Sequence, residues 1–224
     1  QSQKRFAATR AGVFPCFGLH PYFISKTAEE GCNAAFAILE QELSLSFALG
    51  ECGLDFRTKI LGSEPASVKA RQERFFCKQL IFAKEVDKVP ILHIVRAHSE
   101  AIQILRKFYG VGTRGALVHA FNAEFKTAKN YLDLGFHLSI GGALLHANNS
   151  GLHDTVAKMP LDRLLLESDS PDQAPPGWPG QWNEPTVILH VAKRVAELKN
   201  SSPRAVLNAA RENFLQLFHK ELSK

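Results

Sequence analysis

Several features that mark membrane-bound, secreted or disulfide-stabilised proteins are missing from this sequence. No apolar run approaches the roughly 18 residues needed to span a bilayer, and the polar, basic residues 1–10 are not followed by the apolar core of a signal peptide. The cysteines, Cys16, Cys32, Cys52 and Cys77, are scattered and form no Cys-x-x-Cys pair. Such spacing argues against a zinc knuckle and a disulfide framework. We therefore expect a cytoplasmic protein without membrane association.

The sequence also lacks the glycine-rich loops that bind nucleotides. Neither a Gly-x-Gly-x-x-Gly pattern nor a Walker loop follows any predicted strand, which excludes the usual dinucleotide and P-loop sites. No dense block of Lys and Arg occurs, although the formal net charge is +5. This mild excess is compatible with a polyanionic substrate, but the charge alone favours an ordinary basic cytosolic enzyme.

What is present is an alternation of short apolar runs with amphipathic helical stretches. Because the apolar runs are rich in Val, Ile, Leu and Phe, they indicate strands buried on both faces of a parallel sheet. The predicted strands are 13–19, 47–50, 89–95, 116–121, 136–140 and 163–166. The predicted helices are 28–43, 68–86, 99–108, 123–134, 152–158, 185–198 and 203–221.

Strands that alternate with helices predict the α/β class, either as an open doubly wound sheet or as a TIM-like (β/α) barrel. Reactive side chains end nearly every predicted strand, which favours the barrel, because a barrel builds its active site there. A barrel needs eight strands and six are recognisable. We therefore expect residues 1–224 to be a single domain that is incomplete at the N-terminus, missing the first one to two βα units.

Five side chains at or near the ends of these apolar runs have the chemistry of metal and phosphate binding: His20, Glu51, His93, His119 and Asp169. In a barrel the carboxyl ends of the strands surround one mouth, so residues distant in sequence meet there. Two imidazoles and two carboxylates, from Glu51, His93, His119 and Asp169, are a normal ligand set for Zn²⁺ or Mn²⁺. The sequence therefore predicts a divalent-metal centre formed by these four residues.

Five motifs in this order resemble the TatD-type metal-dependent DNases, which are amidohydrolase-like (β/α) barrel hydrolases. They are Gly-Leu-His-Pro at 18–21, Gly-Glu-Cys-Gly-Leu-Asp at 50–55, Pro-Ile-Leu-His at 90–93, Val-His-Ala-Phe at 118–121 and Leu-Leu-Leu-Glu-Ser-Asp-Ser-Pro at 164–171. The resemblance runs from about Phe14 to Phe218 and includes Asn-Glu-Pro at 183–185. Each motif is weak alone, whereas five in order are specific.

The resemblance implies a hydrolase that cleaves DNA phosphodiesters with divalent ions, Zn, Mg or Mn. It implies that Glu51 bridges the metals, that His93 and His119 ligate one ion, and that Asp169 ligates the other and positions or deprotonates the attacking water. Glu51 and Asp169 are then the catalytic residues. His20 and Arg96 correspond to positions near the substrate phosphate, and the protein is expected to be a monomer.

One departure concerns the number of metals. The family begins with a His-x-His on its first strand, and no His-x-His occurs anywhere in this chain. Of the family's ligands for the first metal, this chain retains only Glu51 and Asp169. Either one or two ions are therefore compatible with the residues present.

Three further residues keep two interpretations. Asp55 is either a turn or helix cap, or a partner that orients a metal ligand. Glu167, one step inside the strand end from Asp169, is expected either to face another side or to be structural. Trp178, in a loop rich in Pro, Gly and Trp, either stacks on a base of the substrate or packs locally.

Three functions remain open. The first is a metal-dependent nuclease acting on DNA. The second is a hydrolase of another ester on the same fold, a small phosphoester or an aminoacyl-tRNA ester, because similar centres serve many substrates. The third is a shortened, catalytically impaired paralogue.

Overall fold

The structure is a computed structural model that describes residues 5–7, 9–110, 113–180 and 182–222. The chain divides into two compact units, Gln1–Phe108 (unit 1) and Tyr109–Lys224 (unit 2). In both units parallel strands alternate with helices, which confirms the predicted α/β class. Whether residues 1–224 form one domain stays a prediction.

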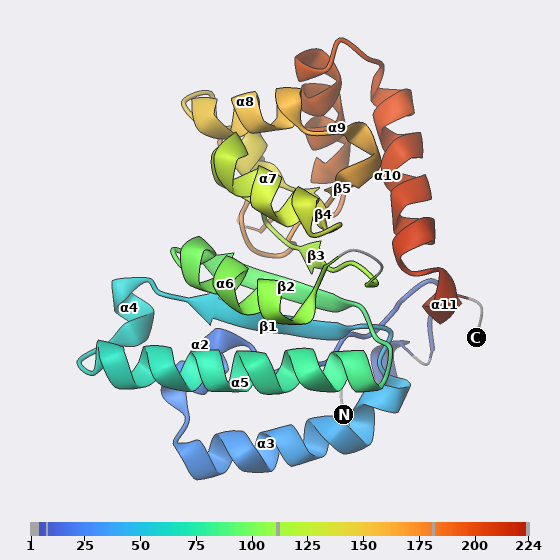
Figure 1. The fold of residues 1–224 in the computed structure, drawn as a ribbon. Coiled ribbons are helices and arrows are strands. Elements are labelled where there is room, and N and C mark those ends of the chain that lie inside the picture. Colours follow the sequence, from blue (N-terminus) through green and yellow to red (C-terminus); the bar gives the residue numbers. More distant parts are fainter. Residues whose placement is uncertain (1–4, 8, 111–112, 181, 223–224) are drawn as a thin grey trace. The chain divides into compact units, whose positions relative to one another are not determined.

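The described residues of unit 1 form two strands and several helices. The helices α2 (Pro21–Lys26) and α3 (Glu29–Glu42) and the 3₁₀ turn η1 (Leu43–Leu45) precede β1 (Leu49–Asp55). The helices α4 (Thr58–Leu61) and α5 (Pro65–Glu85) connect β1 to its parallel partner β2 (Pro90–Val95), and α6 (His98–Phe108) follows. Figure 1 shows the long helix α5 running alongside β1 and β2.

The helix α5 holds two backbone segments with a matched pair of buried glutamines. The Oε1 atom of Gln72 accepts a hydrogen bond from the N–H of Asp55 (2.7 Å), and its Nε2 donates to the Asp55 carbonyl oxygen (3.1 Å). Gln79, two turns further along, makes the same two bonds to Leu19, at 2.6 and 3.1 Å. Because buried backbone groups must be paired, these glutamines fix the end of β1 and the residue that precedes His20.

The predicted strand at 13–19 is wrong: only Phe17 forms a bridge, with Leu49. After the bridge, Leu19 donates its N–H to Gln79 and not to the neighbouring strand. The hydroxyl of Ser46 accepts from the N–H of Phe17 (2.9 Å) in competition with the Ala48 carbonyl (3.4 Å). Pro15 has no N–H to donate, and its carbonyl accepts from Phe47 (2.7 Å).

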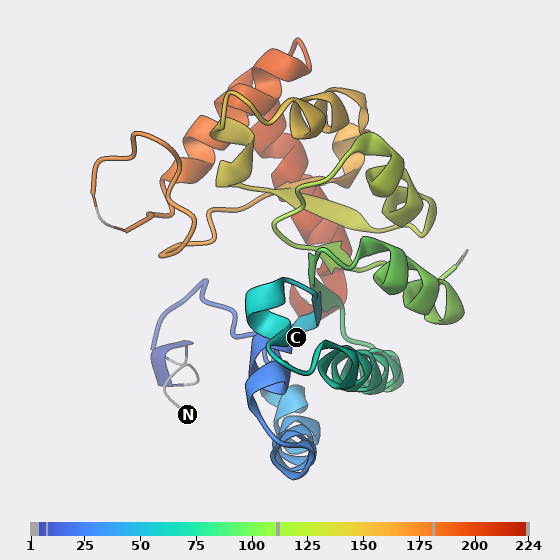
Figure 2. The same ribbon diagram turned by 90° about the vertical axis from the view of Figure 1, so that its left-hand side faces the viewer.

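Unit 2 contains three short parallel strands, β3 (Leu117–Val118), β4 (His137–Ile140) and β5 (Leu164–Leu166). Between them lie α7 (Phe125–Asp133), η2 (Gly142–Leu145), α8 (Ser150–Lys158) and η3 (Leu161–Arg163). After β5 come α9 (Val187–Leu198), α10 (Pro203–Leu217) and α11 (His219–Leu222). The helix α10 packs on β5 and on α9, which lies beside it in Figure 2.

Two predicted boundaries differ from the structure. The strand expected at 47–50 begins at Leu49 and continues to Asp55, so Glu51 lies inside β1 and does not follow it. The last helix, expected to run unbroken over 203–221, ends at Leu217, and α11 starts at His219. No helix among the described ranges is both long and apolar enough to cross a membrane.

Candidate metal-binding active site

Glu51 lies at an irregularity of β1 that separates it from the regular ladder. Gly50 pairs with Ile91 and Cys52 with Leu92, so Glu51 has no partner position on β2. A bulge of this kind redirects a side chain. The Glu51 side chain is about one-third exposed (36%) and lines a hollow of about 770 Å³ in unit 1, together with His20.

His20 enters the same hollow from the start of α2. Its Nδ1 atom accepts a hydrogen bond from the N–H of Tyr22 at 3.0 Å and caps the helix. Since Nδ1 uses its lone pair in this bond, the neutral ring carries its proton on Nε2. It is this Nε2 atom that lies 3.6 Å from the Oε2 atom of Glu51. His20 therefore presents a proton donor to the site and is poorly suited to ligate an ion through Nε2.

His93 has the opposite arrangement. It lies within β2, where it pairs with Gly53, and its Nε2 atom is 3.4 Å from the Oδ2 atom of Asp55. An ionised carboxylate only accepts hydrogen bonds, so this contact places the His93 proton on Nε2. In this tautomer Nδ1 carries the lone pair, and Nδ1 lies 3.6 Å from Oε2 of Glu51. This is the arrangement of a metal ligand whose ring is oriented by a carboxylate behind it.

Asp55 supplies that carboxylate from the interior. Its side chain is fully buried, and Arg57 donates to it from Nε at 2.9 and 3.0 Å as well as from Nη2. Burial by itself raises the pKa of Asp55, but the hydrogen bonds from His93 and Arg57 outweigh it and hold the pKa below its ordinary value. Of the two interpretations of Asp55, the geometry favours the partner that orients a ligand.

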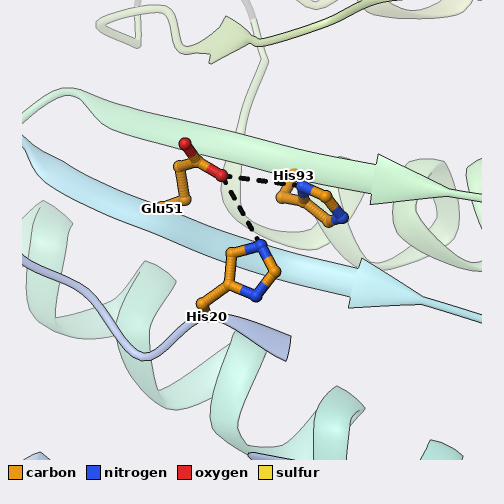
Figure 3. A group of neighbouring side chains, drawn as sticks. All are labelled: His20, Glu51 and His93. Carbon is orange, nitrogen blue, oxygen red and sulfur yellow. Dashed lines mark ion pairs between the residues drawn. The ribbon is translucent and has the colours of Figure 1, made fainter. Parts of the chain in front are cut away.

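Figure 3 shows that His20, Glu51 and His93 point toward one another. Their candidate ligand atoms all lie within 4.8 Å of one another, and the two imidazole rings are 4.4 Å apart between centroids. Ligand atoms about 2 Å from a tetrahedral ion are roughly 3.4 Å apart. The 3.6 Å between Glu51 and His93 fits that spacing, so these two residues fit a divalent ion.

In unit 2 the structure brings His119 and Asp169 together. His119 directly follows β3, Asp169 lies three residues after β5, and their ligand atoms are within 4.8 Å of each other. Glu167, expected to be structural, has its Oε1 atom 3.5 Å from Nδ1 of His119. The sequence did not predict that Glu167 lies beside a candidate metal ligand. The only indication in the sequence was its position two residues before Asp169.

The loop that carries Asp169 is held by a buried asparagine. Asn183, only 4% exposed, donates from Nδ2 to the carbonyl oxygens of Ser168 (2.5 Å) and Asp172 (2.8 Å). Within the loop, the side-chain amide of Gln173 donates to the Asp169 carboxylate. Asp169 itself has a positive φ of 59°, a conformation that the surrounding structure must hold in place.

The two other predicted substrate-binding residues, Arg96 and Trp178, form no hydrogen bond with the candidate metal ligands in the described part of the chain. Arg96 is exposed and immediately follows β2, and no hydrogen bond or ion pair within the described residues joins it to Glu51 or His93. The ring of Trp178 packs edge-on against His190 of α9, at 5.6 Å between centroids. Contact of Arg96 with a phosphate and of Trp178 with a base therefore stay predictions.

A strand-borne carboxylate and imidazole, with a second carboxylate behind the imidazole, form an arrangement suited to binding a divalent metal ion. The family model described as TatD related DNase matches residues 2–219. The chain belongs to this family.

Among similar proteins is the uncharacterized metal-dependent hydrolase YcfH of Escherichia coli, 34% identical over 79% of this chain and 64% of its own length. The uncharacterized metal-dependent hydrolase YjjV of Escherichia coli is 30% identical over 92% of this chain and 77% of its own length. The chain thus spans a little under two thirds of the length of YcfH.

Solved structures agree on the fold. The crystal structure of YjjV, a TatD homologue from Escherichia coli, has a TM-score of 0.85 at 29% identity and covers 97% of this chain and 81% of that one. A TatD family hydrolase from Entamoeba histolytica, 18% identical, has a TM-score of 0.70 over 88% of this chain and 72% of its own, and shows the fold alone. The predicted TIM-like (β/α) barrel class is confirmed.

Proposed function

We propose that this protein is a divalent-metal-dependent hydrolase that cleaves DNA phosphodiester bonds. The observation that carries the proposal is the contact between Glu51 Oε2 and His93 Nδ1 at 3.6 Å, with Asp55 behind the imidazole. Membership of a family described as TatD related DNase supports the choice of substrate. The cytoplasm and a monomeric state are proposed with it, and the four free thiols fit a reducing compartment.

Glu51 and His93 in unit 1, and His119 and Asp169 in unit 2, are the residues proposed to hold the ions. Two imidazoles and two carboxylates suit Zn²⁺ or Mn²⁺. When bound, such ions lower the pKa of water and neutralise charge on a phosphoryl group.

The side chains themselves have distinct proposed roles. Asp169 accepts the proton of the attacking water and is oriented for this by the amide of Gln173. The Nε2–H of His20 donates to a phosphoryl oxygen, because its other nitrogen is occupied by the N–H of Tyr22. Asp55 keeps the proton of His93 on Nε2 and so keeps Nδ1 unprotonated.

Turnover on matched substrates tests this proposal. The purified chain, stripped with a chelator, is assayed on an end-labelled single-stranded oligonucleotide, on a small phosphodiester and on an aminoacyl-tRNA. We expect hydrolysis of the oligonucleotide to vanish on stripping and to return with Mn²⁺, Mg²⁺ or Zn²⁺. Asp169→Asn is expected to lower that rate by about 10²-fold or more, whereas Asp172→Asn, an exposed acid of the same loop, is the matched control.

Three outcomes would contradict parts of the proposal. Activity that survives complete removal of metal excludes the metal-dependent mechanism. If the aminoacyl ester or the small phosphodiester is hydrolysed faster than the oligonucleotide, that compound and not DNA is the preferred substrate. An unchanged rate for Asp169→Asn removes Asp169 from the reaction.

A further inference from the structure

Unit 2 contains a second hollow, and no Lys, Arg, Asp or Glu is among the described residues that line it. Its volume is about 510 Å³, within the usual range for small-molecule sites. It is lined by side chains that follow β3, β4 and β5: Asn122, Ala143, His146, Asn148, Asn149, Gln173 and Ala174. We call this group the amide hollow.

Two carboxamides of the amide hollow are linked head to tail. The Nδ2 atom of Asn149 donates to Oδ1 of Asn122 at 2.9 Å and to the carbonyl oxygen of Ala143 at 3.1 Å. The bond to a backbone carbonyl identifies Nδ2 as the donor, which settles the orientation of the Asn149 amide. Both N–H groups of Asn149 are therefore used in bonds within the protein.

The two amides keep one donor group, on Asn122, and one acceptor atom, on Asn149. Within the described part of the chain, no hydrogen bond engages the Nδ2 group of Asn122 or the Oδ1 atom of Asn149. The internal bond holds the two amides in fixed positions, so little side-chain entropy is lost when a ligand binds. Carboxamide donors and acceptors are the groups with which asparagine and glutamine commonly read the edge of a nucleobase.

The lining also argues against a phosphate as the occupant. Proteins usually bind phosphate with Arg, Lys or a set of backbone N–H groups, and neither Arg nor Lys is found among the described lining residues of the amide hollow. Neutral carboxamides with two alanines beside them suit a polar, uncharged, flat group.

Gln173 connects the amide hollow to the proposed reaction centre. Its side chain lines the hollow, and its amide donates to the carboxylate of Asp169. A group held in the hollow therefore lies one side chain away from the residue proposed to accept the proton of water. We propose that the amide hollow binds a nucleobase of the substrate next to the hydrolysed phosphodiester, an inference that rests on the proposed function.

Direct binding of a nucleoside tests the inference without turnover. We would titrate the full chain with deoxyadenosine and follow the side-chain amide signals of Asn and Gln by ¹⁵N NMR, with deoxyribose and inorganic phosphate as separate probes. We expect saturable shifts of the Asn122 and Asn149 signals with a Kd of about 1 mM, the weak affinity of a single subsite. Deoxyribose and phosphate should leave these signals unchanged.

Asn122→Asp is the informative variant. It keeps the oxygen that accepts from Asn149 but replaces the free donor with a charged acceptor. We expect it to weaken deoxyadenosine binding by about fivefold or more, the effect of one lost hydrogen bond. Asn208→Asp, the same change at an exposed position of α10, should bind as the wild type does.

Three results would overturn the inference: no saturable shift of the hollow's amides with deoxyadenosine, wild-type affinity in Asn122→Asp, or equal shifts with phosphate or deoxyribose. Because the titration needs no hydrolysis, its failure is distinct from failure of the proposed function. If the chain hydrolyses oligonucleotides but binds no nucleoside, only the proposed subsite is refuted. If the chain binds the nucleoside but hydrolyses no substrate, only the proposed activity is refuted.

Discussion

His20 and His93 present different ring nitrogens to the same carboxylate oxygen of Glu51. His20 approaches with Nε2 and His93 with Nδ1, each at 3.6 Å. The difference follows from their other contacts, because Tyr22 donates to His20 whereas Asp55 accepts from His93. For two histidines whose rings are 4.4 Å apart we therefore propose different tasks, one as a proton donor and the other as a metal ligand.

The role of Asp55 predicts a loss of metal affinity on its neutralisation. Asp55→Asn removes the charge that keeps the proton on Nε2 of His93, so Mn²⁺ affinity measured by calorimetry should fall by about 10- to 100-fold. Asp133→Asn, at an exposed position of α7, should have no effect. Equal affinities in the two variants would mean that Asp55 serves only to pair with Arg57.

The hydrogen bonds of Asn183 predict that stability and activity both depend on the loop that carries Asp169. Asn183→Ala leaves the carbonyls of Ser168 and Asp172 without their donor and should lower the free energy of unfolding by about 1–3 kcal/mol. Hydrogen exchange should increase at residues 168–173.

A buried asparagine elsewhere in unit 2 provides the matched control. Asn213 donates to the carbonyls of Leu161 and Leu164, both at 2.8 Å, at the beginning of β5. Asn213→Ala should cost similar stability but leave the rate of the folded enzyme unchanged, whereas Asn183→Ala should lower it. If both variants keep the full rate, the Asn183 bonds do not position Asp169.

His137 predicts a pH dependence of stability. Burial, followed by the nearby charge of Arg163, lowers the pKa of this 3% exposed imidazole from 6.5 to about 4. Between these two pH values the unfolded chain binds a proton that the folded chain does not, so stability rises with pH through this window. The contribution is complete above pH 6.5 and is lost as the pH falls toward 4, by an amount on the order of 3 kcal/mol.

Urea unfolding at pH 7.5 and at pH 5 measures this effect. His137→Leu, which has a side chain of similar size that cannot ionise, should lose less stability than the wild type between the two conditions. The same loss in both proteins would assign the pH dependence to other groups.

The hydrogen bonds of Gln79 predict that an apolar residue at this position lowers the stability of the fold. Gln79→Leu leaves the N–H and carbonyl of Leu19 unpaired in the interior and should destabilise the fold by about 2 kcal/mol or more. Gln103→Leu, at an exposed site on α6, should change the unfolding midpoint in urea little. A Gln79→Leu variant as stable as the wild type would show that Leu19 finds other partners.

Much of the fold was predictable because the strands are apolar and the helices amphipathic. Five of the six predicted strands form. The sixth, at 13–19, failed because Pro15 cannot donate and the hydroxyl of Ser46 competes for the N–H of Phe17, effects that depend on which chain lies alongside. The bulge at Glu51 was likewise invisible, since it exists only in the register of β1 against β2.

The amino-acid sequence by itself determined the α/β alternation, the family and the identities of the candidate ligands, because these depend on periodicity and on motifs that are local in the chain. Only the tertiary structure decided which nitrogen of each histidine faces Glu51, that Asp55 lies behind His93, and that Glu167 lies beside His119. The reason is physical: a tautomer is set by the partner of the opposite ring nitrogen, and a distant residue becomes that partner only when the chain folds.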